Sequence, residues 1–201
     1  NEVCKACKAY SAKNGKVLKN GPIPLFHVGD TFSRLKTRVL FLGTVAYGWE
    51  GELNNIFIEN KEVRTCHLDE TISYIENRIK ELYVQSNMRF FSYINDSLIN
   101  LPFFEREPFR KIAISNLIKC NMGNDKIRNE HLQKNYDYCI RKEFTGNLIS
   151  DINVLDPTHI IILSSNTNKF WRYAKIFMEQ GKKVLFVHHP SSSTINGKEL
   201  F

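Results

Sequence analysis

The segment from Lys111 to Asn121, Lys-Ile-Ala-Ile-Ser-Asn-Leu-Ile-Lys-Cys-Asn, constrains the fold of this chain more than any other. Its apolar side chains form a short run of the kind that is buried on both faces of a parallel sheet. Asn116 inside such a run must find hydrogen-bonding partners or present its carboxamide, with one acceptor and two donors, to a ligand. The alternative interpretation is that Asn116 starts the turn after the strand.

Further strands and helices are indicated along the chain. Three more apolar runs have the length of buried strands: Arg38 to Leu42, His159 to Leu163 and Val184 to Val187. Helical patterns begin at Asp69, cover Leu132 to Phe144, and run from about Asn168 to Gln180, where Gly181 ends the last one. Four strands that alternate with helices predict an α/β fold, a three-layer α/β/α sandwich around a four-stranded, mostly parallel sheet.

Length and charge set the broad class of the protein. With 201 residues, 42% of them hydrophobic, the chain has the size of one well-buried domain. The net charge of +7 favours a polyanionic partner such as nucleic acid. No apolar run approaches the ~20 residues of a membrane span, and residues 1–10 lack the apolar core of a signal peptide. We therefore expect a cytoplasmic, monomeric protein that does not contact a membrane.

A glycine-rich loop follows the strand at Arg38 to Leu42. Three glycines between Gly43 and Gly51 let backbone amides approach a ligand closely, as at the carboxyl ends of parallel strands. The spacing fits neither a dinucleotide fingerprint nor a P-loop. Tyr47, Trp49 and Phe57 are candidates to stack on a planar ligand, although aromatic residues beside such a loop more often belong to the core.

Five cysteines in a reducing compartment indicate metal ligation, redox chemistry or ordinary packing rather than a disulfide framework. Cys4 and Cys7 have the spacing that lets two thiolates reach one metal centre from a single turn. The region from Ala9 to Lys36 is rich in Lys, Gly and Pro, so it is expected to be loop or a short hairpin.

Taken in order, these pieces resemble the uracil-DNA glycosylase superfamily, and most closely its iron–sulfur branch. The resemblance covers most of the chain as a single domain. It rests on these pieces: Cys4-x-x-Cys7, the loop from Gly43 to Gly48, Ile-Ser-Asn-Leu-Ile-Lys-Cys at Ile114 to Cys120, Cys139, the strand from His159 to Leu163, and His189-Pro190-Ser191.

The resemblance implies a structural [4Fe-4S] cluster on four of the cysteines: Cys4, Cys7, Cys120 and Cys139. Such a cluster would tie an N-terminal arm, residues 1–36, to the sheet. Four thiolates also suit zinc, which stays the alternative. Cys66 has no counterpart in the family.

The resemblance also implies roles for residues that follow the strands. Asn116 would recognise a base flipped out of DNA, and His189 would stabilise the negative charge that grows on the base oxygen as the N-glycosidic bond breaks. Tyr47 resembles the tyrosine that closes the family's pocket against the methyl group of thymine, and Phe57 is a further base-stacking candidate. The DNA backbone would be held by Gly43 and by the turn of Ser191, Ser192 and Ser193.

Two departures from the family pattern bear on activity. Active relatives usually carry an acid or amide just after the first glycine to position the attacking water, whereas this chain offers only Thr44, with Glu50, Glu52 and Asp69 as candidates to replace it. Relatives also insert a Leu into the DNA stack after His-Pro-Ser, and here Ile195 is the nearest apolar residue. The DNA partner is therefore expected to be double- or single-stranded, and the weaker wedge fits a single-stranded substrate, a base that is already poorly stacked, or no base flipping.

The resemblance implies a monofunctional DNA glycosylase acting on uracil or another altered base. Val45 and Ala46, where relatives carry larger or polar groups, extend the expected bases to the bulky modified pyrimidines of phage genomes. DNA repair and phage defence are the two corresponding roles. The alternative is a catalytically silent nucleic-acid-binding protein that keeps the fold and the cluster. An esterase using the serines after His189 is disfavoured, because no Gly-x-Ser-x-Gly elbow is present.

Overall fold

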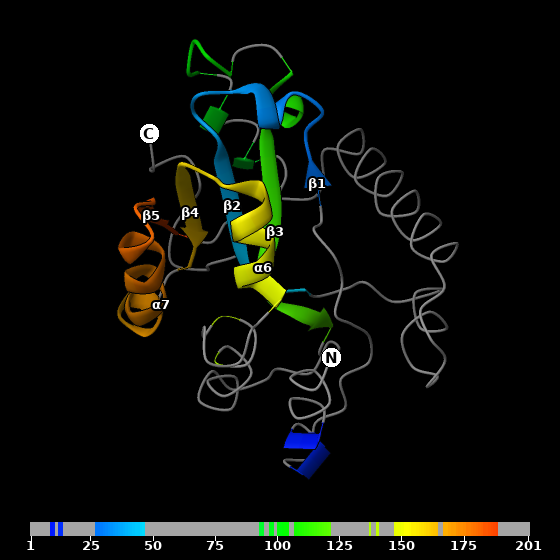
Figure 1. The fold of residues 1–201 in the computed structure, drawn as a ribbon, viewed down its shortest axis with the longest axis vertical. Coiled ribbons are helices and arrows are strands. Elements are labelled where there is room, and N and C mark those ends of the chain that lie inside the picture. The colour runs from blue at the N-terminus through cyan, green and yellow to red at the C-terminus, as the bar shows by residue number, and fades with distance from the viewer. Residues whose placement is uncertain are drawn as a thin grey trace, which may run out of the picture.

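The computed structural model describes residues 9–10, 12–13, 27–46, 93–94, 97–98, 100–104, 107–121, 137, 140, 147–164 and 167–188. The principal elements of this part are, in chain order, β1 (His27–Val28), η1 (Phe32–Arg34), β2 (Val39–Ala46), η2 (Pro108–Arg110), β3 (Ile112–Asn121), α6 (Asn147–Leu155), β4 (His159–Leu163), α7 (Thr167–Glu179) and β5 (Lys183–Val187) (Figure 1).

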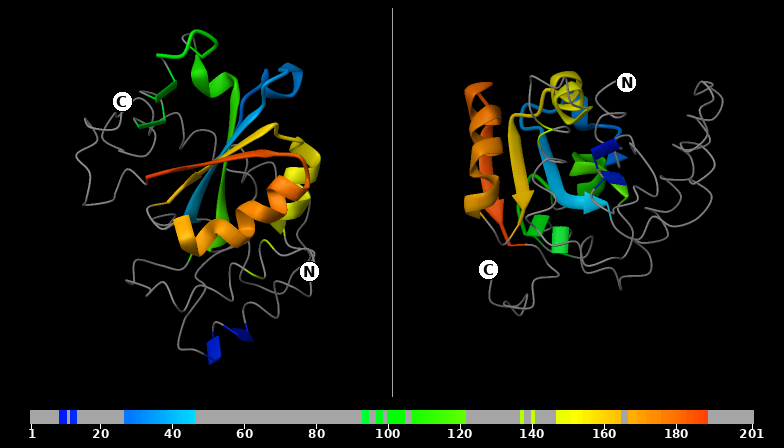
Figure 2. Two further views of the ribbon diagram at one scale, coloured as in Figure 1. Left: turned by 90° about the vertical axis from the view of Figure 1, so that its left-hand side faces the viewer. Right: turned by 90° about the horizontal axis from the view of Figure 1, so that it is seen from below.

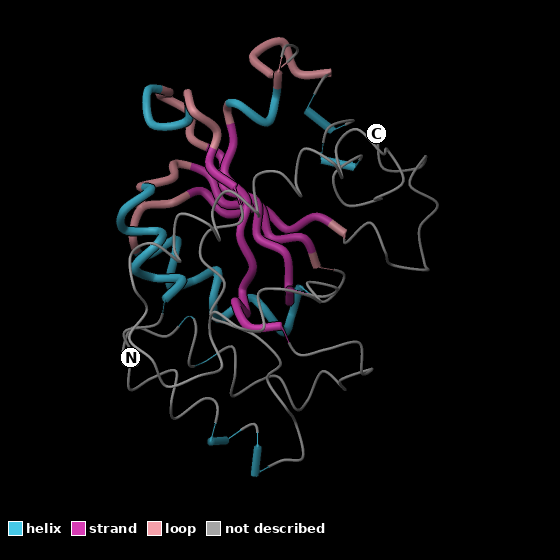
Figure 3. The backbone as a smooth tube through the Cα atoms, turned by 90° about the vertical axis from the view of Figure 1, so that its right-hand side faces the viewer, coloured by secondary structure: helices cyan, strands magenta, loops and turns pink. Residues whose placement is uncertain are grey.

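The sheet has five strands in the order β1-β3-β2-β4-β5. The four strands β2 to β5 pair in parallel, and β1 pairs antiparallel with β3 at one edge. Figure 3 shows these strands as a twisted sheet, the usual consequence of L-residue sterics. The α/β class and the mostly parallel sheet are confirmed, whereas the expected number of four strands is wrong by one.

The additional strand lies in the N-terminal arm, in the region expected to be loop or short hairpin. With two residues, β1 is too short to show an alternating pattern in the sequence. Its pairing continues into the following turn, where the backbone N–H of Gly29 donates to the carbonyl of Ile112 at 2.8 Å. Within the described residues, backbone hydrogen bonds therefore attach the end of the arm to the sheet.

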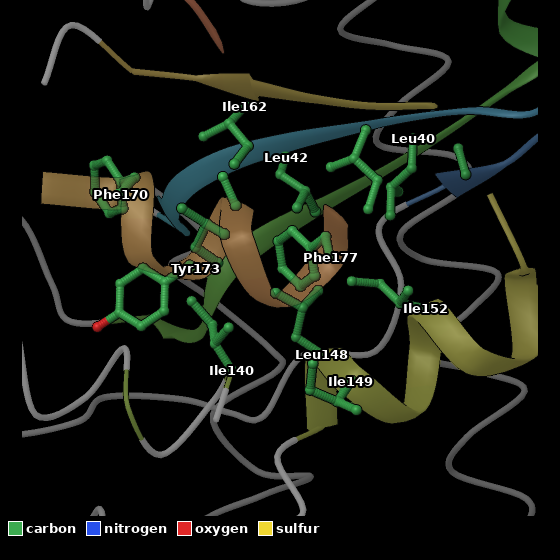
Figure 4. Packing of buried hydrophobic residues seen from close by; sticks show 14 of the residues in the cluster. Leu40, Leu42, Ile140, Leu148, Ile149, Ile152, Ile162, Phe170, Tyr173 and Phe177 are labelled. Atoms are coloured by element: carbon green, nitrogen blue, oxygen red, sulfur yellow. The ribbon is translucent and has the colours of Figure 1, made fainter. Parts of the chain in front are cut away.

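Both faces of the sheet carry a hydrophobic cluster. One face packs against α6 and α7 (Figure 2), and its cluster includes Leu40, Leu42 and Ile162 from the strands with Ile152 and Phe177 from the two helices (Figure 4). We call this the helical face. The opposite face carries Phe41 and Ile114 from the strands and is packed by Ile94, Leu98 and Phe104.

The sequence pattern of α7 explains its place in the fold. Phe170, Tyr173, Ala174 and Phe177 recur at helical spacing and are all buried on the helical face. The helix ends at Gly181, whose φ of 77° is the left-handed conformation that glycine adopts without strain. The backbone N–H of Lys182 donates to the carbonyl of Phe177, which closes a Schellman motif. The predicted last helix and its glycine stop are confirmed.

Helix α6 was not among the expected elements, although Leu148, Ile149 and Ile152 on its inner side have amphipathic spacing and are buried. Asp137 and Ile140, from the helix expected across Leu132 to Phe144, are helical in the structure, and the rest of that segment lies outside the described residues. The helix expected from Asp69 also lies outside them. None of the helices in the described ranges has the length and apolar character that a membrane crossing requires.

Candidate functional site

The carboxyl ends of β2, β3, β4 and β5 meet at one edge of the sheet, because all four strands are parallel. Numbered among themselves, these strands have the order 2-1-3-4, since β2 lies between β3 and β4. The chain leaves β2 toward β3 on one side and later returns to β4 on the other, so the strand order reverses between β2 and β4. In open α/β sheets, ligands bind outside the carboxyl ends of strands at such a switch point.

Asn116 lies on β3 near this edge, and its Cα is paired with that of Gly43 on β2. Its side chain shares a sheet face with Ile112 and Ile114, opposite the helical face. Only 6% of its surface is exposed. Because β3 continues to Asn121, the alternative that Asn116 starts the turn after the strand is wrong.

Gly43 brings no side chain to the face beside the Asn116 carboxamide, and Gly43 is itself buried. Leu42 on β2 pairs with Ile162 on β4, so the next residue outward on β4, Leu163, lies level with Gly43. Leu163 in turn pairs with Val187 on β5. The row across this face therefore consists of one carboxamide, one glycine and two aliphatic side chains, a composition that suits a planar, partly polar ligand.

Thr44, the expected catalytic residue of the first motif, is not brought beside Asn116. It follows Gly43 directly on β2, before the register shift between Val45 and Ala46. Successive strand side chains point to opposite faces, so Thr44 is directed to the helical face and Asn116 away from it. Among the described residues, Asn116 and Gly43 are the two predicted site residues that the structure places on one face.

Two serines near the same edge were not singled out in the sequence. Ser115 is fully buried on the helical face, and its hydroxyl has no hydrogen-bond partner in the part of the chain that the structure describes. Ser164 follows β4 and is buried, and its backbone N–H donates to the carbonyl of Val187 at 2.8 Å. Ser164 thus joins the carboxyl ends of β4 and β5. A polar residue inside or directly after an apolar run was the available signal for both serines.

A polar cluster that we call the Asp137 cluster joins Asp137 to α7; Asp137 and Tyr173 are buried, whereas Arg172 is exposed. The Tyr173 hydroxyl donates to a carboxylate oxygen of Asp137 at 3.0 Å, and the Arg172 guanidinium donates both to that oxygen and to the Tyr173 hydroxyl. Burial raises the pKa of the Tyr173 phenol, so the phenol stays protonated and acts as a donor. Ile140 packs in the same hydrophobic cluster. This arrangement anchors Asp137 and Ile140 to α7 and the core.

The predicted metal ligands lie mostly outside the described residues. Cys4, Cys7 and Cys139 are among the residues left out, and for Cys120 the structure gives only the backbone, within β3. No group of three or more His, Cys, Asp or Glu side chains that could hold a metal ion is present in the described part of the chain. The iron–sulfur cluster, with zinc as the alternative, therefore stays a prediction.

The other predicted site residues, Tyr47, Phe57, His189 and Ser191 to Ser193, also fall outside the described residues. The neighbouring His188 is described and lies exposed directly after β5. His188 therefore lies at the edge of the sheet that carries Asn116 and Gly43. In comparisons with known proteins, the sequence matches no family model and no curated protein.

Proposed function

We propose that the protein is a monofunctional DNA glycosylase that hydrolyses the N-glycosidic bond of uracil or another altered base, with a fold of the uracil-DNA glycosylase type. The observation that carries the proposal is the carboxamide of Asn116, nearly buried beside Gly43 near the carboxyl edge of a parallel sheet. The net charge of +7 agrees with a DNA substrate.

A carboxamide at this place suits recognition of a pyrimidine edge. Its N–H₂ group donates to a ring carbonyl while its oxygen accepts from a ring N–H, a pairing that uracil satisfies. A site that buries a carboxamide strongly rejects a base with the wrong arrangement of hydrogen-bond donors and acceptors. The polar atoms of the site would be left unpaired if such a base were bound. The base must first leave the DNA stack, at a cost of a few kcal/mol.

In the proposed reaction, water adds to the sugar carbon and the base leaves with the electrons of the N-glycosidic bond. The attacking water loses one proton as it bonds to the sugar, and the departing base carries negative charge on its carbonyl oxygen until it takes up a proton. His189, two residues beyond the end of β5, is the proposed donor to that oxygen. The serines that follow it are the proposed contacts to the DNA backbone.

The proposed cluster ligands connect this site to the N-terminal arm. Cys120 is on β3, four residues after Asn116, so one strand carries both a proposed ligand and the proposed base-recognition residue. A cluster held by Cys4, Cys7, Cys120 and Cys139 would serve a structural purpose. Metal analysis of purified protein tests this part separately: iron and sulfide with a brown colour are expected, and stoichiometric zinc without iron would contradict it.

A second candidate, the catalytically silent nucleic-acid-binding protein, is favoured by the placement of Thr44. The residue expected to position water is directed to the helical face, away from Asn116. This candidate predicts DNA binding that weakens steeply with salt, as phosphate contacts require, and no abasic site in any substrate.

The test is mass spectrometry of bases released from uracil-containing DNA, ordinary DNA and phage DNA with hypermodified pyrimidines. Wild-type protein is expected to release one altered base, and Asn116→Ala is expected to lower its release by about 10²-fold. Ser115→Ala is the matched control, since Ser115 adjoins Asn116 but faces the helices and its hydroxyl is unpaired among the described residues.

The two candidates give different outcomes in this test. Equal release by the wild type and Asn116→Ala would contradict the assignment of Asn116. No release from any substrate, with DNA binding intact, would favour the binding protein over the glycosylase.

A further inference from the structure

The outer side of α7, beside the edge strand β5, has a surface that the proposed base site does not use. It consists of Trp171, Lys175 and Met178 on α7, with Phe186 of β5 next to them, and we call it the Trp171 surface. Trp171 is 55% exposed, and its ring lies 6.3 Å from that of Phe186 at an interplanar angle of 32°. Trp171, Lys175 and Met178 are spaced by four and three residues, so they form one exposed stripe.

The core packing of α7 depends mainly on other side chains. The helix already buries Phe170, Tyr173 and Phe177 against the sheet, on its other side. Phe186 packs against the same cluster and supports one side of the indole, which leaves the rest of Trp171 in solvent. An exposed tryptophan held in place by a second aromatic ring is a rigid platform for a planar partner.

The charge around this surface selects the kind of partner. Lys175 lies on the stripe itself, in a chain with a net charge of +7, whereas Lys182 and Lys183 lie at the opposite end of β5 and Glu179 ends α7. Arg172 and Lys182 are engaged by Asp137 and Asp156, whereas Lys175 is exposed and has no ion pair with another described residue. A polyanion complements this segment, and a second copy of the same positive surface would be repelled.

The Trp171 surface is close to the carboxyl edge of the sheet. Helix α7 begins at Thr167, shortly after the end of β4, and Trp171 is only about 6 Å further along the helix axis at ~1.5 Å per residue. Phe186 is the last residue but one of β5, two residues before His188. The platform and the proposed base site therefore belong to the same end of the molecule.

We propose that the Trp171 surface binds single-stranded DNA, with the Trp171 indole stacked on an unpaired base and Lys175 contacting a backbone phosphate. Stacking needs a free base face, which a duplex does not offer, whereas every unpaired base provides one. The inference rests on the proposed function for its choice of DNA and deepens it by naming the form of the strand.

The primary test uses the fluorescence of Trp171 itself. The chain has two tryptophans, so a Trp49→Phe protein reports from Trp171 alone. Titration with oligothymidylate of about 12 nucleotides, within the ~4–16 that such sites cover, is expected to quench this emission. A duplex of the same length is expected to quench it much less. Absence of quenching by the single strand, or equal quenching by the duplex, overturns the inference.

Variants sharpen the assignment. Trp171→Ala is expected to weaken oligothymidylate binding about tenfold, and Trp171→Phe to restore part of it. Val154→Ala, which truncates an exposed apolar side chain on α6, is the control and should bind as the wild type does. Lys175→Gln should reduce the slope of log affinity against log salt by about 0.7, while Lys36→Gln, before β2 at the opposite edge, should not.

The outcomes separate this inference from the proposed function. Base release that persists while quenching is absent contradicts the Trp171 surface alone. Quenching that persists without any base release contradicts the glycosylase alone. Self-association that Trp171→Ala abolishes, with no effect of oligothymidylate on the emission, would show that the surface joins two copies of the chain and would overturn the inference.

Discussion

The two edges of the parallel sheet differ in how their polar groups are used. At the amino-terminal edge, Asp156 accepts from both Arg38 and Lys182, and Arg110 forms ion pairs with Asp30 and Glu107. At the carboxyl-terminal edge, the buried polar side chains of the described residues are short and uncharged: Asn116, Ser115 and Ser164, with the half-buried Thr44 beside them. One edge consists of satisfied charge pairs, and the other keeps buried polar groups near the switch point.

This difference indicates a division of labour between stability and chemistry. The amino-terminal pairs join segments that are distant in the chain, because Arg38 precedes β2, Asp156 precedes β4 and Lys182 precedes β5. They hold the strands in register at one end. Because these pairs stabilise the amino-terminal edge, the residues at the carboxyl-terminal edge can bind a ligand without also having to stabilise the sheet. Ligand sites of open α/β folds generally lie at this edge.

The largest expected effect at the amino-terminal edge is that of Gly29→Ala. A Cβ atom at Gly29 would lie 2.2 Å from the backbone carbon and oxygen of Arg110, so the backbone itself would have to move. The change would also disturb the hydrogen bond from the Gly29 N–H to Ile112. We expect a loss of about 3 kcal/mol in the free energy of unfolding, measured by chemical denaturation.

Gly43→Ala at the other edge is the matched variant. If the two edges differ as described, the Gly43→Ala protein should have a free energy of unfolding closer to that of the wild type than the Gly29→Ala protein has. Its base release should be impaired, because the added methyl group would lie beside the Asn116 carboxamide. A Gly43→Ala protein that loses as much stability as Gly29→Ala, or a Gly29→Ala protein as stable as the wild type, would remove the distinction between the edges.

The sequence predicted β3, β4, β5 and α7 well because their signals are local, whereas β2 continues four residues past its expected end at Leu42, through part of the expected glycine-rich loop. The apolar run from His159 to Leu163 coincides with β4, and the pattern from about Asn168 to Gln180 gave α7 within a residue at each end. Gly181 marked the stop because a left-handed residue is required there. In contrast, β1 depends on pairing between His27 and Ile114, which no local pattern records.

The candidate site was predictable in its residue types but not in its geometry. Asn116 stood out as a polar residue in an apolar run, and the structure places it beside Gly43. The direction of Thr44 follows from strand alternation only once Gly43 is known to lie within β2 rather than in a loop after it. No local sequence pattern predicts the Asp137 cluster, because Asp137 is separated from Arg172 by 35 positions in the chain and from Tyr173 by 36.

A smaller effect is expected from Asp156→Asn, which removes one charge at the amino-terminal edge. Asp156 has a φ of 45°, a conformation that asparagine tolerates, so the change isolates the ion pairs with Lys182 and Arg38. The Asp156 carboxylate is largely exposed, and we expect a loss of stability well below that of Gly29→Ala. Most of this loss should disappear in about 1 M salt, where the Debye length is ~3 Å. A loss that salt does not change would show that the backbone turn, rather than the charge, is responsible.

The smallest effect is expected from His159, which opens β4 opposite Lys183 of β5. Burial, and then the Lys183 charge, lower the pKa of the His159 imidazole below its usual value. Between this lowered pKa and the ~6.5 of the unfolded chain, the unfolded state binds more protons, so stability rises with pH in that window and is lost as the pH falls through it. His159→Gln should therefore flatten this part of the stability curve, and Lys183→Gln should raise the pKa of His159, measured by NMR titration. An unchanged pH dependence in His159→Gln would assign the slope to another group. The neutral imidazole would then contribute nothing to stability at the amino-terminal edge. The charge pairs alone would distinguish the amino-terminal edge from the edge that carries Asn116.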